Sequence, residues 1–295
     1  MDHKTFLKSL PAEVSGALTR RSDAAGLRHL VAHLGLIALA AVWIASGGPL
    51  WWAVVPVQGV MIVFLFTLEH EATHKTPFAS EALNEWVGRF CGLLLLLPFE
   101  WFRYFHLAHH RFTNIPGKDP ELADYDRKLD AWGPFLWHVT GLPYWGSLAK
   151  QLWVNARGRA DAPYLPERVK PRLKQEARIM LGLYLLLALS LLVTPVVLWV
   201  WVLPVLVGQP FLRLYLMAEH GRCPKVANMF DNTRTTYTNA IVRFLAWNMP
   251  YHTEHHVFPA VPFYKLPELH GVMKAHLLHE QTGYAEFTKE TIKGF

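Results

Sequence analysis

Two long stretches without a charged side chain constrain this 295-residue chain more than any other feature of its sequence. No Asp, Glu, Lys or Arg occurs in residues 29–68 or in residues 179–212, which are 40 and 34 residues long. An α-helix needs about 20 apolar residues to cross a bilayer, so each stretch has room for two membrane spans. The pattern predicts an integral membrane protein.

Turn signals divide both stretches. Ser-Gly-Gly-Pro at positions 46–49 interrupts the first stretch, and Thr-Pro at 194–195 interrupts the second. Because Gly and Pro mark turns, we expect two helical hairpins. The four spans are expected at about residues 29–46, 50–74, 174–193 and 196–218.

The positions of Lys and Arg predict an orientation. Basic residues gather in segments 1–28 and 156–178, outside the expected spans. The positive-inside rule places such segments on the cytoplasmic side, together with both termini. We therefore attribute the net charge of +6 to membrane topology and expect no nucleic-acid partner. An inner or plasma membrane is the expected location.

The expected fold is all-α, with four transmembrane helices in two hairpins, interfacial helices and a cytoplasmic histidine-rich cap. Segments 83–99 and 131–155 are too short or too mixed to span and are predicted to form amphipathic or interfacial helices. The expected organisation is a cytoplasmic tail at 1–28, a membrane domain at 29–275 and a C-terminal tail at 276–295.

Histidine is the second unusual feature, with 16 residues in the chain. Eight of them form three clusters whose i, i+3 and i, i+4 spacing lets each cluster aim at one point from a helix. A ninth histidine ends the fourth expected span at the same depth. The nine are His70, His74, His106, His109, His110, His220, His252, His255 and His256.

Imidazole is a ligand for Zn, Cu, Fe and Ni, and eight imidazoles exceed what one metal ion can hold. Histidine near a membrane is costly and marks function. The clusters therefore predict two metal ions at the cytoplasmic face. The isolated histidines are expected to be structural; they are His3, His29, His33, His138, His270, His276 and His279.

Cysteine supplies no competing site. Cys91 and Cys223 are the only cysteines, and no C-x-x-C pattern occurs. A thiolate zinc site and a structural disulfide are therefore not expected.

Two other metal sites share part of the pattern. Residues 70–74 read H-E-x-x-H, as in zinc metalloproteases, where the glutamate is the general base. Residues 71–74 also read E-x-x-H, one half of a ferritin-like di-iron site. Each alternative explains the first cluster and leaves the other two without a role. A membrane zinc protease stays open as an alternative function.

The three clusters, their order and their spacing resemble the membrane fatty acid desaturase family, which includes hydroxylases and ketolases. The flanking segments HHRFTN at 109–114, NMPYHTEHHVFP at 248–259 and VPFYKLPELH at 261–270 extend the resemblance. It covers about residues 50–275.

The resemblance implies a four-span bundle that holds two iron ions with histidines of the three clusters and one after the fourth span, which His220 matches. Some members carry an Asn one turn before that last histidine; here the position is Leu216, so that ligand is not supported. Iron is implied because zinc has no accessible redox chemistry.

The implied activity is O₂-dependent oxidation of an acyl lipid, with a double bond as the expected product. Hydroxylation or ketone formation on another apolar substrate is the alternative within the family, because both outcomes follow from the placement of the same C–H bonds. Carboxylates adjoin three of the histidine groups and are candidates to orient ligand N–H groups, or else pair with arginines: Glu71, Glu219 and Glu254.

The electrons must come from another protein. The sequence has neither a nucleotide-binding fingerprint nor an iron–sulfur cysteine pattern. A ferredoxin- or cytochrome-type donor is therefore the expected partner, besides the lipid substrate and the bilayer.

Overall fold

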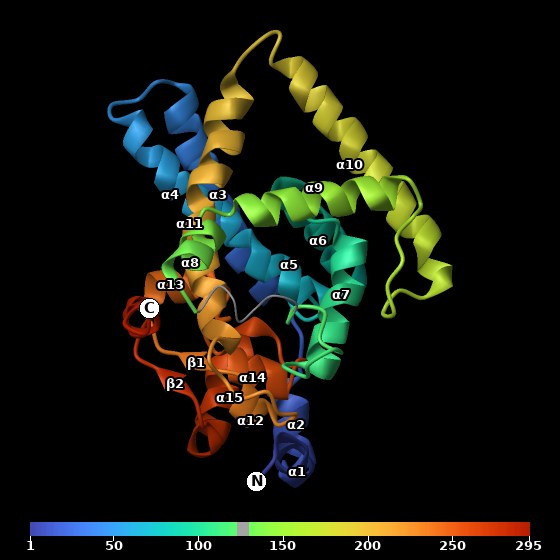
Figure 1. The fold of residues 1–295 in the computed structure, drawn as a ribbon, viewed down its shortest axis with the longest axis vertical. Helices are drawn as coiled ribbons and strands as arrows, with labels where there is room; N and C mark the ends of the chain where they lie inside the picture. The colour runs from blue at the N-terminus through green and yellow to red at the C-terminus, as the bar shows by residue number, and fades with distance from the viewer. Residues whose placement is uncertain (123–129) are drawn as a thin grey trace.

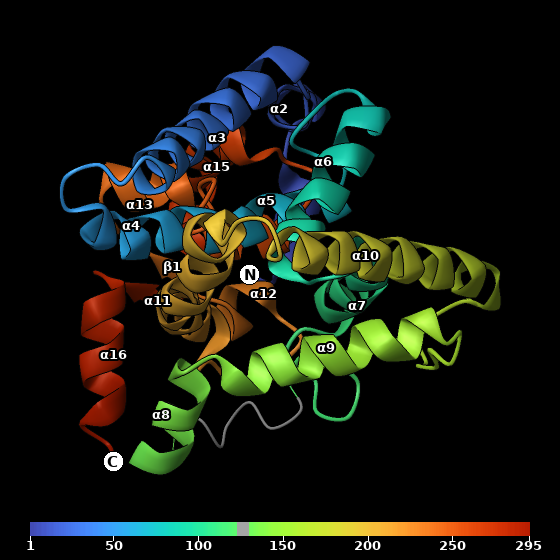
Figure 2. The ribbon, with the colours of Figure 1, turned by 90° about the horizontal axis from the view of Figure 1, so that it is seen from above.

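Helices form nearly all of the regular structure in a computed structural model that describes residues 1–122 and 130–295. Three apolar helical segments run together through one end of the molecule (Figure 1), and a compact C-terminal cap, residues 221–295, closes the other end. Two long helices, residues 142–156 and 170–190, extend outward beside these segments (Figure 2). The cap and the inner ends of the helices together hold the histidines.

The N-terminal half of the chain supplies the first helices. Their bounds are α1 (His3–Ser9), α2 (Ala12–Leu18), α3 (Asp23–Ala45), α4 (Trp51–Val63), α5 (Leu65–Thr73), α6 (Glu81–Leu95) and α7 (Phe99–Phe112).

After the undescribed residues 123–129 the chain continues as α8 (Trp132–Val139), α9 (Leu142–Ala156), the 3₁₀ turn η2 (Glu167–Val169), α10 (Lys170–Ser190), the π-helical turn η3 (Leu198–Val202) and α11 (Leu203–His220). The cap consists of α12 (Met229–Asn232), β1 (Thr235–Thr236), α13 (Ala240–Leu245), α14 (His252–Val257), η4 (Phe263–Lys265), α15 (Leu266–Met273), η5 (Lys274–His276), β2 (Glu280–Gln281) and α16 (Tyr284–Ile292). The two short strands pair in parallel.

The chain turns between α3 and α4 at the predicted Gly-Gly-Pro position. Helix α3 ends and α4 begins around the predicted Gly-Gly-Pro turn, where Gly47 has φ +66° and the Trp43 indole donates to the Pro49 carbonyl at 3.1 Å. A left-handed backbone favours glycine, which explains the sequence signal. Helices α4 and α5 are separated only at Phe64 and together fill the second expected span.

Helices α4 and α11 approach closely because glycines face each other at their crossing. A Cβ atom on Gly59 would lie 2.1 Å from the Pro204 carbonyl oxygen, and one on Gly208 would lie 2.4 Å from Gly59. Small residues allow this backbone approach in membrane helices. The crossing fixes the position of α5, which continues α4, relative to the end of α11.

Three segments are long and apolar enough to cross a membrane: Ala12–Ala45, Trp51–Thr73 and Leu198–His220. They overlap three of the four expected spans, although the first begins well before residue 29. Helix α10 differs because its first half is charged through Arg178, which leaves only its second half apolar. The bent pair α6 and α7, with an angle of 99° between the helices, would be a fourth span if it were counted as one.

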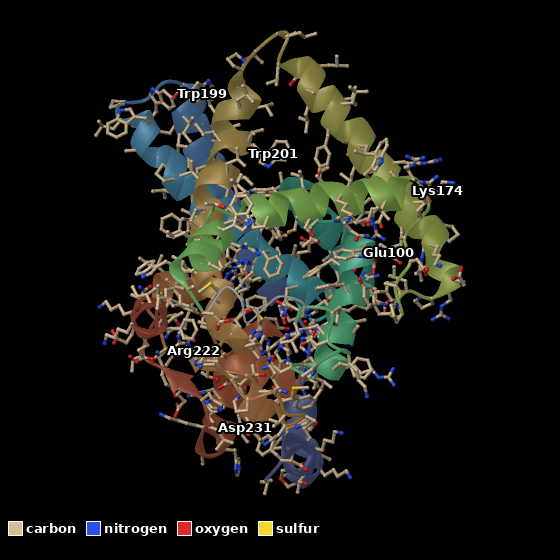
Figure 3. The ribbon with its side chains drawn as sticks, in the orientation of Figure 1. Glu100, Lys174, Trp199, Trp201, Arg222 and Asp231 are labelled. Atoms are coloured by element: carbon tan, nitrogen blue, oxygen red, sulfur yellow. The ribbon has the colours of Figure 1, made fainter. Side chains whose placement is uncertain are left out.

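Helix α10 also departs from the expected second hairpin. It meets α11 at one end of the molecule and then diverges from it (Figure 1), and its main packing partner is α9. Figure 3 shows Trp199 and Trp201 at this end, with Arg222 and Asp231 at the opposite end, in the cap. An apolar cavity of about 500 Å³ lies between α9, α10 and α11.

The segments expected to be tails are folded. Phe6 of α1 is buried against Phe230 and His276 of the cap, with ring centroids 5.6 and 5.3 Å apart. At the other end of the chain, Phe287 of α16 is buried against the end of α11. Both termini therefore contribute to the cap region.

Candidate metal centre

The nine predicted histidines come together where the helices meet the cap. Helix α5 supplies His70, and His74 is its C-cap; α7 supplies three histidines, α11 ends at His220, and α14 supplies three more. Eight of the nine fall into two adjoining groups with ring nitrogens close enough to share an ion.

We call them the first and second groups. The first contains His70, His74, His106, His110 and His255, and the second contains His109, His220 and His256. Within each group the ligand atoms all lie within 4.8 Å of one another. The ninth residue, His252, adjoins the second group, with its Nε2 3.1 Å from Nε2 of His220.

The two groups divide the sequence clusters in a way that differs from the expectation that each cluster aims at one point. Adjacent positions on a helix point about 100° apart, since one turn holds 3.6 residues. His110 therefore joins His106 in the first group while His109 faces the second. Likewise, His255 and His256 of α14 belong to different groups.

The ring nitrogens approach as a shared ion requires. Nε2 of His74 lies 2.8 Å from Nε2 of His106, and Nε2 of His110 lies 3.2 Å from Nε2 of His255. In the second group, Nε2 of His109 lies 3.2 Å from Nε2 of His220. Two such atoms at these separations either share a proton or point their lone pairs at one ion.

Buried ring nitrogens that lack a hydrogen-bond partner favour a shared metal ion over a shared proton. His256 is buried, and its Nε2 has no hydrogen-bond partner among the residues that the structure describes. Burial holds the pKa of His252 and His256 well below the ordinary range, and burial lowers that of His255 to about 3. The rings are thus neutral at pH 7, which is the form that binds metal.

Hydrogen bonds behind the rings set their tautomers in the second group. Nδ1 of His109 donates to Asp119 at 3.0 Å, and Nδ1 of His220 donates to the Asn232 carbonyl at 3.1 Å. Nδ1 of His256 lies 3.2 Å from Oγ1 of Thr113, whose own proton goes to the His109 carbonyl. With Nδ1 protonated, Nε2 is left as the free ligand atom.

Asp119, Thr113 and Asn232 were not predicted from the sequence. Asp119 lies in the loop after α7 and is held there by backbone N–H groups of Asn114 and Glu121, at 2.8 and 2.9 Å. Such a loop turns back on the preceding helix without any periodic signal. The only hint is an acidic residue shortly after a histidine cluster.

The three predicted carboxylates have different surroundings. Oε1 of Glu71 lies 3.1 Å from Nδ1 of His255, and Oε1 of Glu219 lies 3.3 Å from Nδ1 of His252. Glu254 instead contacts Nδ1 of His270 at 2.5 Å and accepts from Thr235. Glu71 and Glu219 thus adjoin candidate ligands, whereas Glu254 links parts of the cap.

The histidines expected to be structural lie outside both groups. His33 is buried between the Met61 carbonyl and the Trp247 indole, at 2.9 and 3.1 Å. His29 stacks on Phe244. The others likewise take no part in either group: His3, His138, His270, His276 and His279.

Comparison with known proteins gives one family. A family model described as fatty acid desaturase matches residues 49–288. A sphingolipid delta(4)-desaturase/C4-monooxygenase of Mus musculus is 27% identical over 270 residues, which cover 86% of this chain and 76% of that protein. An omega-3 fatty acid desaturase of Vigna radiata is 25% identical over 249 residues, covering 75% of this chain and 63% of that protein.

Proposed function

The chain belongs to the fatty acid desaturase family, and from that premise we propose that it is an O₂-dependent, di-iron membrane oxidase that introduces a double bond into a fatty acyl or lipid substrate. Family membership makes it an oxidoreductase of the desaturase type. The iron, the oxygen requirement and the substrate are our proposal.

The observation that carries the proposal is the pair of adjoining imidazole groups. One iron would be held by the first group, and the other by the second group together with His252. Bound iron would supply the redox chemistry with O₂ that removal of hydrogen from an unactivated C–H bond requires. Zinc lacks that chemistry, and a single zinc ion would leave most of these imidazoles without a role.

The chain's own residues prepare the site in two ways. Asp119, Thr113 and the Asn232 carbonyl fix ring orientation and leave Nε2 atoms turned inward. Apolar rings close the first group on the helical side: Phe102 stacks on His106 at 5.5 Å between centroids, and Phe66 packs against Phe102 at 5.4 Å. An apolar chain that approaches from this side would contact these rings, which favours an acyl substrate.

We place the centre on the cytoplasmic side of an inner or plasma membrane. The three spanning segments leave the cap, α1 and the basic residues around Lys170 and Arg172 outside the apolar helix halves. The positive-inside rule supports this orientation.

Hydroxylation is the second candidate. The printed name of the Mus musculus relative combines desaturase and C4-monooxygenase activity, so both outcomes occur for one protein of this kind. The two reactions require the same metal groups and differ in substrate placement. The protease alternative has no support from the family match.

Product analysis tests the proposal. Purified protein is loaded with iron, reduced with dithionite under argon and freed of excess dithionite, then supplied with O₂ and a panel of acyl lipids, and the products of one turnover are analysed by mass spectrometry. Loss of two hydrogens is expected, and gain of one oxygen would establish the hydroxylase alternative. The control is the same protein under argon, which should form no product. Cleavage of a protein substrate with bound zinc would contradict both.

A further inference from the structure

A cavity of about 420 Å³ forms a groove between α6 and α10, with Glu100 at the start of α7 between them. Figure 2 shows α10 passing beside α6 and α7. None of the described residues that line this groove belongs to either histidine group. The groove is therefore a site separate from the candidate metal centre, and what it binds can be considered independently of the proposed function.

The groove crosses the boundary between the polar and apolar parts of both helices. On α10, Arg172 and Glu176 line one end, and Ile179, which follows the last charged residue of the helix, lines the other. On α6, the lining residue Phe90 begins a run of ten residues without charge. Ile179 is 55% exposed. Because charged side chains are costly inside a bilayer, the apolar end of the groove faces lipid and the polar end lies at the membrane surface.

The polar end of the groove holds two carboxylate oxygens without a hydrogen-bond donor. Oε1 of Glu100 and Oε1 of Glu176 are buried and have no hydrogen-bond partner among the described residues. Nη2 of Arg172 lies 3.0 Å from the first oxygen, and Nε of Arg89 lies 3.4 Å from the second, but neither contact has the geometry of a hydrogen bond. A buried carboxylate oxygen is stabilised by a donor, so a ligand with N–H groups fits this end.

The charges that line the groove are balanced. Two arginines, Arg89 and Arg172, oppose two glutamates, Glu100 and Glu176, and no other ionisable side chain of the described residues lines it. A balanced lining favours a zwitterionic ligand over an anion, which would meet both carboxylates. The side chain of Arg172 is 59% exposed and available to a phosphate. Trp86 also lines the groove and is 73% exposed, as tryptophans are at a membrane–water interface.

We propose that the groove binds one phospholipid whose headgroup carries a primary ammonium, a phosphatidylethanolamine. The ammonium donates to Glu100 and Glu176, and the phosphate oxygens accept from Arg172. The acyl chains pass over Phe90 and Ile179 into the bilayer. The bound lipid links α10 to α6 and α7, in addition to the packing of α10 on α9. A quaternary ammonium, as in phosphatidylcholine, has no N–H to donate, and phosphatidylglycerol has no cation.

Native mass spectrometry of the purified protein in detergent measures lipid binding. Phosphatidylethanolamine, phosphatidylcholine and phosphatidylglycerol with identical acyl chains are titrated separately. One phosphatidylethanolamine should bind at least about tenfold more tightly than either of the other lipids, because the loss of one hydrogen bond to a charged group corresponds to about that factor. An affinity for phosphatidylcholine or phosphatidylglycerol that equals or exceeds the affinity for phosphatidylethanolamine would overturn the proposal.

Two single variants test the headgroup contacts, each against the same change at an exposed residue outside the groove. Arg172→Ala, with Arg168→Ala as its control, should weaken phosphatidylethanolamine binding at least about tenfold. Glu176→Gln, with Glu167→Gln as its control, should abolish the preference for phosphatidylethanolamine over phosphatidylcholine. Both controls should bind as wild type does, and the unfolding midpoint without added lipid shows that each variant is folded. Groove variants that bind phosphatidylethanolamine as their controls do would overturn the proposal.

One further variant separates the groove from the metal centre. His106→Ala should leave the affinity for phosphatidylethanolamine unchanged, since no histidine of either group lines the groove. A weaker affinity would place the lipid at the metal centre and overturn the proposal. If wild type forms no oxidised product, the proposed function fails, while the lipid affinities still judge the groove.

Discussion

The two histidine groups are built from the same residue type but supported in different ways. In the second group, His109, His220 and His256 each have a partner behind the ring, supplied by loops or by the cap. In the first group, Nδ1 of His70 and of His110 has no hydrogen-bond partner among the described residues. Apart from His255, whose Nδ1 lies 3.1 Å from Glu71, helix packing orients the first group, and outer hydrogen bonds orient the second.

This difference predicts which structural changes should disturb each group. A change in a loop should disturb the second group and spare the first, whereas a change in helix packing should disturb both, because α11 carries His220 and α5 carries His70. The predictions below are ordered from the largest expected effect to the smallest.

Removing one ligand from each group should have the largest effect. His106→Ala and His256→Ala each take away an imidazole that the remaining side chains cannot replace. We expect turnover to fall at least about 100-fold in both and iron to fall from about two per chain to about one or fewer. Elemental analysis and turnover assays of the purified variants measure both quantities. Full iron content in either variant would remove that histidine from the ligand set.

Asp119→Asn should weaken metal binding in the second group and leave the first group unchanged. The amide keeps the size of the side chain but accepts more weakly from His109, so the second group should lose metal affinity by about 10- to 100-fold. Competition with a chelator should then release one iron ahead of the other. Glu254→Gln is the control, because that carboxylate contacts His270 and Thr235 instead. Simultaneous release of both irons would contradict the division.

Gly59→Leu should affect both groups through the helix crossing. The added side chain meets the Pro204 carbonyl and must force α4 away from α11, and overpacking of this kind costs about 1–3 kcal/mol or more. A lower unfolding midpoint in detergent and parallel loss of both irons are expected. Gly35→Leu is the matched control, since a Cβ there meets nothing within 4 Å. Equal midpoints would show that the crossing tolerates a side chain.

His279→Ala should have the smallest effect. His279 pairs with Asp231 at 2.9 Å on the partly exposed surface of the cap, and such pairs contribute about 0–1 kcal/mol. Iron content should equal that of wild type. A loss of one iron would add a histidine that neither group contains.

The sequence predicted the residues of the centre better than their arrangement. Histidines at i, i+3 and i, i+4 are a local helical signal, so eight of the nine candidates stood out before any fold was known, and His220 was added from its place at the end of the fourth expected span. Their division was not predictable, because His109 and His110 are sorted by the angle at which α7 faces α11 and α14. That angle depends on the turn at Leu96, with φ 59°, and on the packing of the cap.

The fold was predictable to a similar degree. The Gly-Gly-Pro turn and three spanning segments follow from local composition and charge. The divergence of α10 from α11 does not, since it depends on the packing of α10 against α9. Asp119 was missed for the same reason: a loop residue gains its role from what it turns back to contact.

Anomalous X-ray scattering at the iron edge, from crystals of the iron-loaded protein, tests the central claim most directly. The account predicts two iron peaks, one among the five histidines of the first group and one beside His109, His220 and His256. A single peak, or a zinc signal confined to His70 and His74, would contradict it.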